Sequence, residues 1–175
     1  APRRLIAYRF TAEDHFSVAF QRENIQSVSV QNGTLTAICT TADGQHPFCV
    51  AIRVLTDGRL VDAEQTVDVQ GASWGEVYVS IISSYCEEKF VEKAISLLDE
   101  GCALGWEAFY QEHVADFSAL MNRSDIDMET DSSLYEQTLD MRLHRLRLDE
   151  NARDAGLFAL YYQFGRYLMV SSSRP

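Results

Sequence analysis

The stretch IQSVSVQNGTLTAIC, residues 25–39, decides the fold of the first half of this chain. Two runs of alternating apolar and polar residues flank the dipeptide Asn32-Gly33. Asn-Gly readily adopts the two positive-φ positions of a type I′ turn, which matches the twist of paired strands. The stretch therefore predicts an antiparallel β-hairpin.

The segments on either side of this hairpin also have the character of strands. We expect a turn at residues 11–14, a second hairpin turn at Thr56-Asp57-Gly58, and a break of the chain at Gly71 and Gly75. About six strands at short spacing are typical of part of an antiparallel sandwich and leave a sheet edge open. The remaining predicted strands are RLIAYRF (4–10), HFSVAFQR (15–22), FCVAIRVL (48–55), RLVDAEQTVDVQ (59–70) and EVYVSIISS (76–84).

After Ser84 the apolar period changes from two to between three and four residues, which predicts helices. Gly101 and Gly105 are expected to separate the first two, and Ser132 or Ser133 to cap the third. The last helix, which is apolar nearly all round, is expected to need protein on more than one side. The predicted helices cover residues 86–100, 106–123, 134–147 and from about Asp154 onward. Strands followed by helices give an α+β fold class.

The formal net charge is −11, and residues 76–150 hold 17 acidic and 6 basic side chains. This balance argues against nucleic acid as a partner and against an anionic membrane, because both are bound by clustered Lys and Arg. The sequence contains no run of eighteen apolar residues, which is about the length needed to span a bilayer. The four cysteines show no metal-ligand spacing, and Cys39 and Cys49 are expected as buried residues on strands.

Two sequence patterns are candidate sites. Oxygen ligands at alternate positions suggest a calcium loop, but its sixth position is Thr130 where a sharp turn requires glycine, so an acidic helix cap is preferred. The alternating acids are Asp125, Asp127, Glu129 and Asp131, with Glu136 at the twelfth position. His113 and Asp116 lie one helical turn apart, but a helix-to-helix polar contact, with Arg123 able to pair with Asp116, is preferred to acid–base or metal chemistry.

Three motifs in the second half of the chain are informative: HVADFSALMNRSDIDM (113–128), TLDMRL (138–143) and LFALYYQFGRYLMVSSSRP (157–175). They resemble family 95 of the glycoside hydrolases, the α-L-fucosidase family. The last of these motifs is the longest and most specific of the three, whereas Ser124 and Met141 depart from the family pattern. The upstream stretch DGRLVDAEQTVDVQGASWGEVYVSIISSY (57–85) is similar to strands of the same family, so the resemblance extends over residues 7–175. Family-motif positions, expected to be structural, are His113, Asp116, Arg123, Arg142, Gln163, Gly165, Arg166 and Arg174.

The resemblance implies an N-terminal β super-sandwich, a helical linker, an (α/α)6 barrel and a C-terminal β domain. Residues 1–85 would be part of the sandwich, residues 86–150 the linker, and residues 151–175 the start of the barrel. Family members hydrolyse α-L-fucosyl and some α-L-galactosyl linkages with inversion and without a cofactor. The residues that do so lie beyond the matched motifs, so no catalytic, cofactor or metal residue is carried over to this chain.

We therefore expect the non-catalytic N-terminal portion of a glycoside hydrolase. Its partners would be the remainder of the parent enzyme and, through the parent, fucosylated or galactosylated glycans. We also expect self-association through the open sheet edge and the final helix, because large exposed apolar patches mark interaction sites. The alternative is a naturally short carbohydrate-binding or scaffold module without hydrolase activity.

Overall fold

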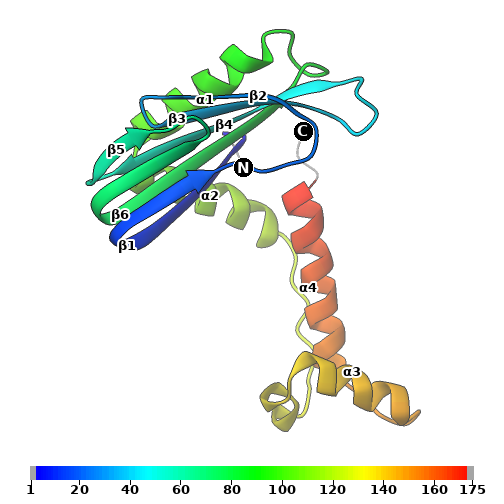
Figure 1. The fold of residues 1–175 in the computed structure, drawn as a ribbon. Helices are drawn as coiled ribbons and strands as arrows, with labels where there is room; N and C mark the ends of the chain where they lie inside the picture. Colours follow the sequence, from blue (N-terminus) through cyan, green and yellow to red (C-terminus); the bar gives the residue numbers. More distant parts are fainter. Residues whose placement is uncertain (1–2, 173–175) are drawn as a thin grey trace. The chain divides into compact units, whose positions relative to one another are not determined.

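A computed structural model describes residues 3–172 of the chain. The described part contains six strands, four α-helices and one short 3-10 helix (Figure 1). Its contacts divide into two compact units, residues 1–113 and 114–175, and the boundary falls inside the second α-helix. Strands followed by helices confirm the predicted α+β class.

The strands of the first unit form one antiparallel sheet in the order β1-β6-β4-β3-β2, with β5 paired to β6 (Figure 1). Both β1 and β2 lie at sheet edges in this order. The bounds are Leu5–Ala19 for β1, Ile25–Gln31 for β2, Thr34–Thr40 for β3, Pro47–Thr56 for β4, Arg59–Asp62 for β5 and Thr66–Ser83 for β6.

The hairpin of β2 and β3 is confirmed. Gln31 pairs with Thr34, and the two residues between them, Asn32 and Gly33, have φ values of 51° and 68°. Both lie in the left-handed region that a type I′ turn requires. The backbone N–H groups of Asn32 and Gly33 donate to the carboxylate of Asp62, at 2.5 and 2.9 Å, which ties the turn to β5.

The two long strands run through positions where we predicted turns or breaks. β6 continues through Gly71 and Gly75, and β1 continues through residues 11–14. A bulge at Asp14, which pairs with Ala72 and has a φ of 76°, lets β1 bend beside Gly71, whose φ is 68°. Bulges and glycines bend strands without ending them, and this is why the predicted breaks were wrong.

The predicted hairpin turn at residues 56–58 is also wrong. β4 and β5 both pair antiparallel with β6, one after the other along it, so the chain runs on in the same direction through residues 56–58. The real turn follows β5, where the N–H of Ala63 donates to the carbonyl of Thr66 at 2.9 Å. Contacts to β6 decide the local path, since Asp57 accepts from the N–H of Ser73 at 2.9 Å.

The bend of the long strands produces two hydrophobic clusters. In one, Val67 and Val69 from the first half of β6 pack with Leu35 and Val54. Because a straight strand rises about 3.3 Å per residue, this first half reaches that cluster only by folding back over the sheet. The second cluster joins the other face of the sheet to the first helix, and Tyr78 is its largest fully buried side chain.

Helix α1 spans Phe90–Leu104 and contains Gly101, so the predicted separation occurs only at Gly105, whose φ is 78°. Helix α2 follows at Trp106–Met121. The cysteines of the described residues are all free, and Cys39 and Cys49 are buried in different clusters, as small apolar residues would be. Burial raises the pKa of Cys49 to about 11.

The second unit has a 3-10 helix η1 at Ser132–Glu136, helix α3 at Leu139–Leu148 and helix α4 at Ala155–Ser172. The predicted third helix is therefore two elements, and neither predicted serine caps it. Asp131 caps η1 by accepting from the N–H of Ser133, and Thr138 is the N-cap residue of α3. Within residues 3–172, none of the helices combines the length and apolar character needed to cross a bilayer.

Candidate functional site

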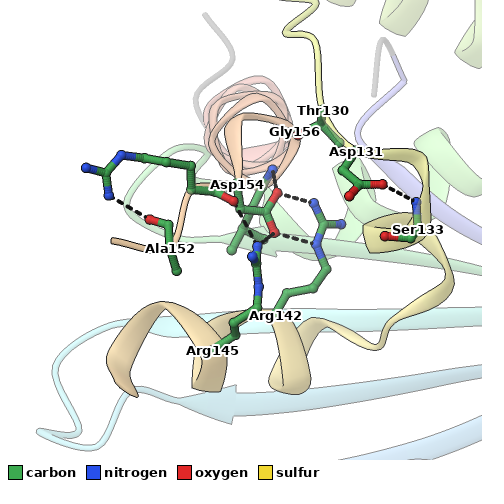
Figure 2. A network of polar contacts seen from close by, with 10 residues as sticks. Thr130, Asp131, Ser133, Arg142, Arg145, Ala152, Asp154 and Gly156 are labelled. Carbon is green, nitrogen blue, oxygen red and sulfur yellow. Dashed lines mark hydrogen bonds and ion pairs between the residues drawn. The ribbon is translucent and has the colours of Figure 1, made fainter. Parts of the chain in front are cut away.

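The polar centre of the second unit is a buried ion pair between α3 and the start of α4 (Figure 2). Nε of Arg142 donates to Oδ2 of Asp154 at 2.9 Å, and its Nη2 donates to Oδ1 at 2.7 Å. The side chains are 7% and 0% exposed. This two-point geometry fixes both the distance and the angle between the groups, and a lysine could not reproduce it.

Asp154 has further partners. Arg145 donates to Oδ2 at 3.4 Å, and the N–H of Leu157 donates to Oδ1 at 2.9 Å, which makes Asp154 the N-cap of α4. The Arg142 guanidinium, with the Leu157 N–H and the charge of Arg145, holds the pKa of Asp154 below its usual range. A carboxylate held ionised in this way is a poor proton donor, so its role is to join the helices.

The loop before η1 is tied to the same place. Thr130 Oγ1 accepts from the N–H of Gly156 at 2.8 Å (Figure 2). A Cβ at position 156 would lie 3.0 Å from both Thr130 Cγ2 and the Tyr135 hydroxyl, so the close approach favours glycine there. The guanidinium of Arg142 also lies 5.6 Å from the centre of the Tyr135 ring. Loop, η1, α3 and α4 therefore meet around one ion pair.

A second polar cluster joins α4 to the end of α2. Nη2 of Arg166 donates to the carbonyl oxygens of Leu120 and Met121 at 3.2 and 2.8 Å, and its Nη1 donates to the carbonyl of Ser124. The last carbonyls of a helix have no partner inside that helix, and a cation there also complements the helix dipole. Arg166 therefore acts as a C-terminal cap for α2, supplied from α4.

The neighbours of Arg166 extend this cap. Gln163 accepts from Arg166 at 3.0 Å and donates to the carboxylate of Asp125. The hydroxyls of Ser124 and Tyr162 lie 2.8 Å apart, within hydrogen-bonding distance. Asp125 is thus engaged by a side-chain amide, and Asp131 by the N–H of Ser133. Across residues 3–172 there is no group of three or more His, Cys, Asp or Glu side chains that could hold a metal ion.

The structure brings some of the predicted family-motif residues together and leaves others apart. Gln163 and Arg166 meet at the end of α2, whereas Arg142 belongs to the ion pair. His113 lines a separate hollow of about 420 Å³ in the first unit, next to Trp106 and Tyr110. Asp116 lies on α2, and Arg123 lies just beyond the end of that helix. Arg174 falls outside the described residues. Gly165 has open space around it within the described part, because a Cβ there would meet nothing within 4 Å.

Sequence reasoning missed Asp154 as a partner of Arg142, although Asp directly before an apolar helical run is a recognised N-cap signal. It also missed Arg145, Thr130 and Tyr162. The partners of these side chains are 9 to 38 residues away in sequence, and no spacing rule links them.

The second unit has an apolar groove between α3 and α4 with a volume of about 520 Å³. Its lining is entirely apolar or aromatic in character. Several of these side chains are strongly exposed: Leu160 is 49% exposed, Phe164 53% and Phe158 63%. The groove is lined by Leu139, Leu143, Leu146, Leu157, Phe158, Leu160, Tyr161 and Phe164. Contiguous exposed apolar surface of this kind marks an interaction site, a ligand-binding groove or an aggregation-prone surface.

Comparison with known proteins bears on this same part of the chain. Residues 105–175 match the glycosyl hydrolase family 95 catalytic domain. A stretch of 67 residues is 34% identical to Alpha-L-fucosidase 2 of Arabidopsis thaliana. That similarity covers 38% of this chain and 8% of the length of the relative. The ion pair, the Arg166 cap and the apolar groove all lie within residues 105–175.

Proposed function

We propose that this chain, whose residues 105–175 match the glycosyl hydrolase family 95 catalytic domain, is the non-catalytic N-terminal portion of an α-L-fucosidase-like glycoside hydrolase. In this proposal the whole protein hydrolyses α-L-fucosyl or α-L-galactosyl linkages. The residues present here support the catalytic barrel and present α3 and α4 to its other helices.

The apolar groove between α3 and α4 carries the proposal. A helix with apolar side chains on most of its surface is normally covered on more than one side. In α4 the described contacts cover Gly156 and Leu157, while most of the large apolar side chains further along the helix are at least one-third exposed. Further helices of a barrel would cover such a surface, and the open space beside Gly165 would admit a close neighbour.

The state of the buried carboxylates also supports a non-catalytic role. Hydrolysis with inversion needs an acid and a base on opposite sides of the scissile bond, about 6.5–9.5 Å apart with room for water. Within the described residues the buried carboxylates are Glu76 and Asp154, which belong to different units. Glu76 accepts from the Tyr78 hydroxyl at 3.0 Å and pairs with Arg9 at 3.6 Å. Both carboxylates are thus engaged by neighbouring side chains.

The polar clusters then have a mechanical role in the proposal. The Arg142–Asp154 pair sets the angle between α3 and α4, and Arg166 fixes α4 to the end of α2. Since these helices would form one side of a barrel, their geometry would set where the next helices pack. Remote positioning of this kind affects catalysis strongly, because misplacement by about 1 Å can cost about a hundredfold in rate.

The test is an activity assay of the purified 175-residue chain on p-nitrophenyl α-L-fucoside and the matching α-L-galactoside. We expect no release of nitrophenol above that of a mock purification from cells that lack the gene. Turnover that rises in proportion to chain concentration, and is absent from the mock sample, would overturn the non-catalytic assignment.

A further inference from the structure

The first unit contains a polar groove that the proposed hydrolase function does not use. It has a volume of about 650 Å³, which is within the range of small-molecule sites, about 300–1,000 Å³. Its lining differs from the apolar α3–α4 groove because hydroxyl and amide side chains predominate. The polar lining residues are Ser29, Gln31, Asn32, Thr34, Thr36 and Arg53.

The floor of the groove is built on paired strands. Gln31 of β2 pairs with Thr34 of β3, which pairs in turn with Arg53 of β4. One step along the same face, Ser29 pairs with Thr36. Neighbouring strands are about 4.8 Å apart, and residues two apart on one strand lie about 7 Å apart, so these groups form a regular grid of donors and acceptors.

The wall of the groove is apolar and comes from α1. Val91 and Ile95 lie four residues apart, so they occupy the same face of the helix, and both line the groove. A ligand would therefore meet polar groups on one side and aliphatic carbon on the other. This combination matches a saccharide, which has hydroxyl groups around its edge and C–H groups on its ring faces.

The groove has no uncompensated charge among its lining residues, which indicates a neutral ligand. Arg53 is the one charged lining residue, and its side chain is 21% exposed. Its Nε donates to Thr34 Oγ1 at 3.0 Å, and its Nη1 forms an ion pair with Asp99. The positive charge is thus already compensated. The Ser and Thr hydroxyls and the Gln and Asn amides each donate and accept, as ligand hydroxyls also do.

The groove is held in shape without a ligand. The carboxylate of Asp62 accepts from the N–H groups of Asn32 and Gly33, which fixes the turn at one end. The Arg53–Asp99 ion pair links the floor to α1. Sites built on strands and helices with such supporting contacts lose little entropy when a ligand binds.

From this geometry we propose that the groove between α1 and the β2–β3 hairpin is a binding site for a neutral saccharide unit. The proposal concerns the first unit alone and does not depend on the hydrolase assignment, so the two can fail separately. With hydroxyl and amide contacts and no aromatic side chain among the lining residues, we expect a dissociation constant in the millimolar range.

The experiment is a titration of the ¹⁵N-labelled chain with L-fucose, and separately with sodium glucuronate, followed by amide chemical shifts. We expect saturable shifts in residues 29–36 and 91–95 with L-fucose, and weaker binding of the glucuronate anion. Absence of saturable shifts, shifts confined to other residues, or tighter binding of glucuronate would overturn the proposal.

Matched variants locate the site. Gln31→Ala and Thr36→Val are each expected to weaken L-fucose binding about fivefold, since each removes a hydrogen bond to the ligand. Gln26→Ala changes the same residue type on the same strand outside the groove and should leave binding unchanged. The amide spectra of the variants show directly whether they are folded. Equal binding by Gln31→Ala and the parent chain, with both folded, would contradict the assignment.

Discussion

Arg142 and Asp154 form a two-point ion pair at 2.9 and 2.7 Å that joins α3 to the N-terminus of α4. Between them lie the end of α3 and a mostly polar loop, residues 149–153, which the pair closes. The same carboxylate caps α4 through the N–H of Leu157. One side chain therefore sets both where α4 begins and how it leaves α3.

Removal of the arginine should destabilise the second unit. Arg142→Met leaves Asp154 buried with a weaker partner, Arg145 at 3.4 Å, and loss of one member of a buried pair costs about 3 kcal/mol. Hydrogen exchange of amides in α3 and α4 measures the change. Arg147→Met is the control, because Arg147 is on the same helix and is exposed. Equal protection of the two variants would contradict the role given to the pair.

The same pair predicts a pH dependence. The pKa of Asp154 is lowered from 3.8 in the folded chain. Its contribution to the free energy of unfolding is therefore complete at pH values above 3.8, and it is lost as the pH falls through the lower pKa of the folded state. Asp154→Asn removes this contribution. The free energy of unfolding of the two proteins, followed from about pH 6 to about pH 2, should therefore converge at the acid end. A constant difference over the whole range would contradict this account.

Replacement of two glycines by alanine is expected to change the stability of the chain in opposite directions. A Cβ at Gly58 would lie 2.7 Å from the carbonyl oxygen of Gln70 and 2.8 Å from Cβ of Ala72, so Gly58→Ala should lower stability by about 1–3 kcal/mol. Gly165 lies within α4 with nothing near its missing Cβ, so Gly165→Ala should raise helix stability by about 0.5–1 kcal/mol. Thermal unfolding measures the stability of both variants against the parent chain. A Gly58→Ala variant as stable as the parent would contradict the close packing of residue 58 against β6.

A buried hydroxyl provides another test. Ser80 is 0% exposed, and its Oγ has no hydrogen-bond partner among the residues that the structure describes. Ser80→Ala removes a desolvated polar group and should raise the free energy of unfolding by about 1 kcal/mol. Ser73→Ala serves for comparison, because it removes a hydroxyl that donates to Asp57 and should lower stability. Denaturant unfolding of both variants measures the signs, and a destabilised Ser80→Ala protein would point to a partner for that hydroxyl.

Local chemistry explains which elements could be predicted from sequence. The Asn32-Gly33 hairpin was predictable because two adjacent residues carry the turn. The start of α4 near Asp154 was predictable because a capping side chain precedes an apolar run. Helix periodicity likewise located α1 and α2. The exception is Gly101, which was expected to end the first helix but lies within α1.

Elements that depend on distant partners were not predictable in the same way. Gly71 and Gly75 look like breaks, but pairing with β1, β4 and β5 carries β6 through them. Arg166 caps a helix that ends 45 residues earlier, at Met121, and Arg142 meets a carboxylate 12 residues away. Sequence patterns showed that such side chains were present but not which groups they would meet.

The central claim, that the α3–α4 groove is built to be covered by protein, is tested most directly by sedimentation velocity of the 175-residue chain. We predict that its sedimentation coefficient rises with concentration, because exposed grooves on two copies can cover one another. The double variant Leu160→Glu, Phe164→Glu should remain monomeric, whereas Leu148→Glu, an exposed position on α3 outside the groove, should behave like the parent chain. A parent chain that stays monomeric at high concentration would contradict the claim.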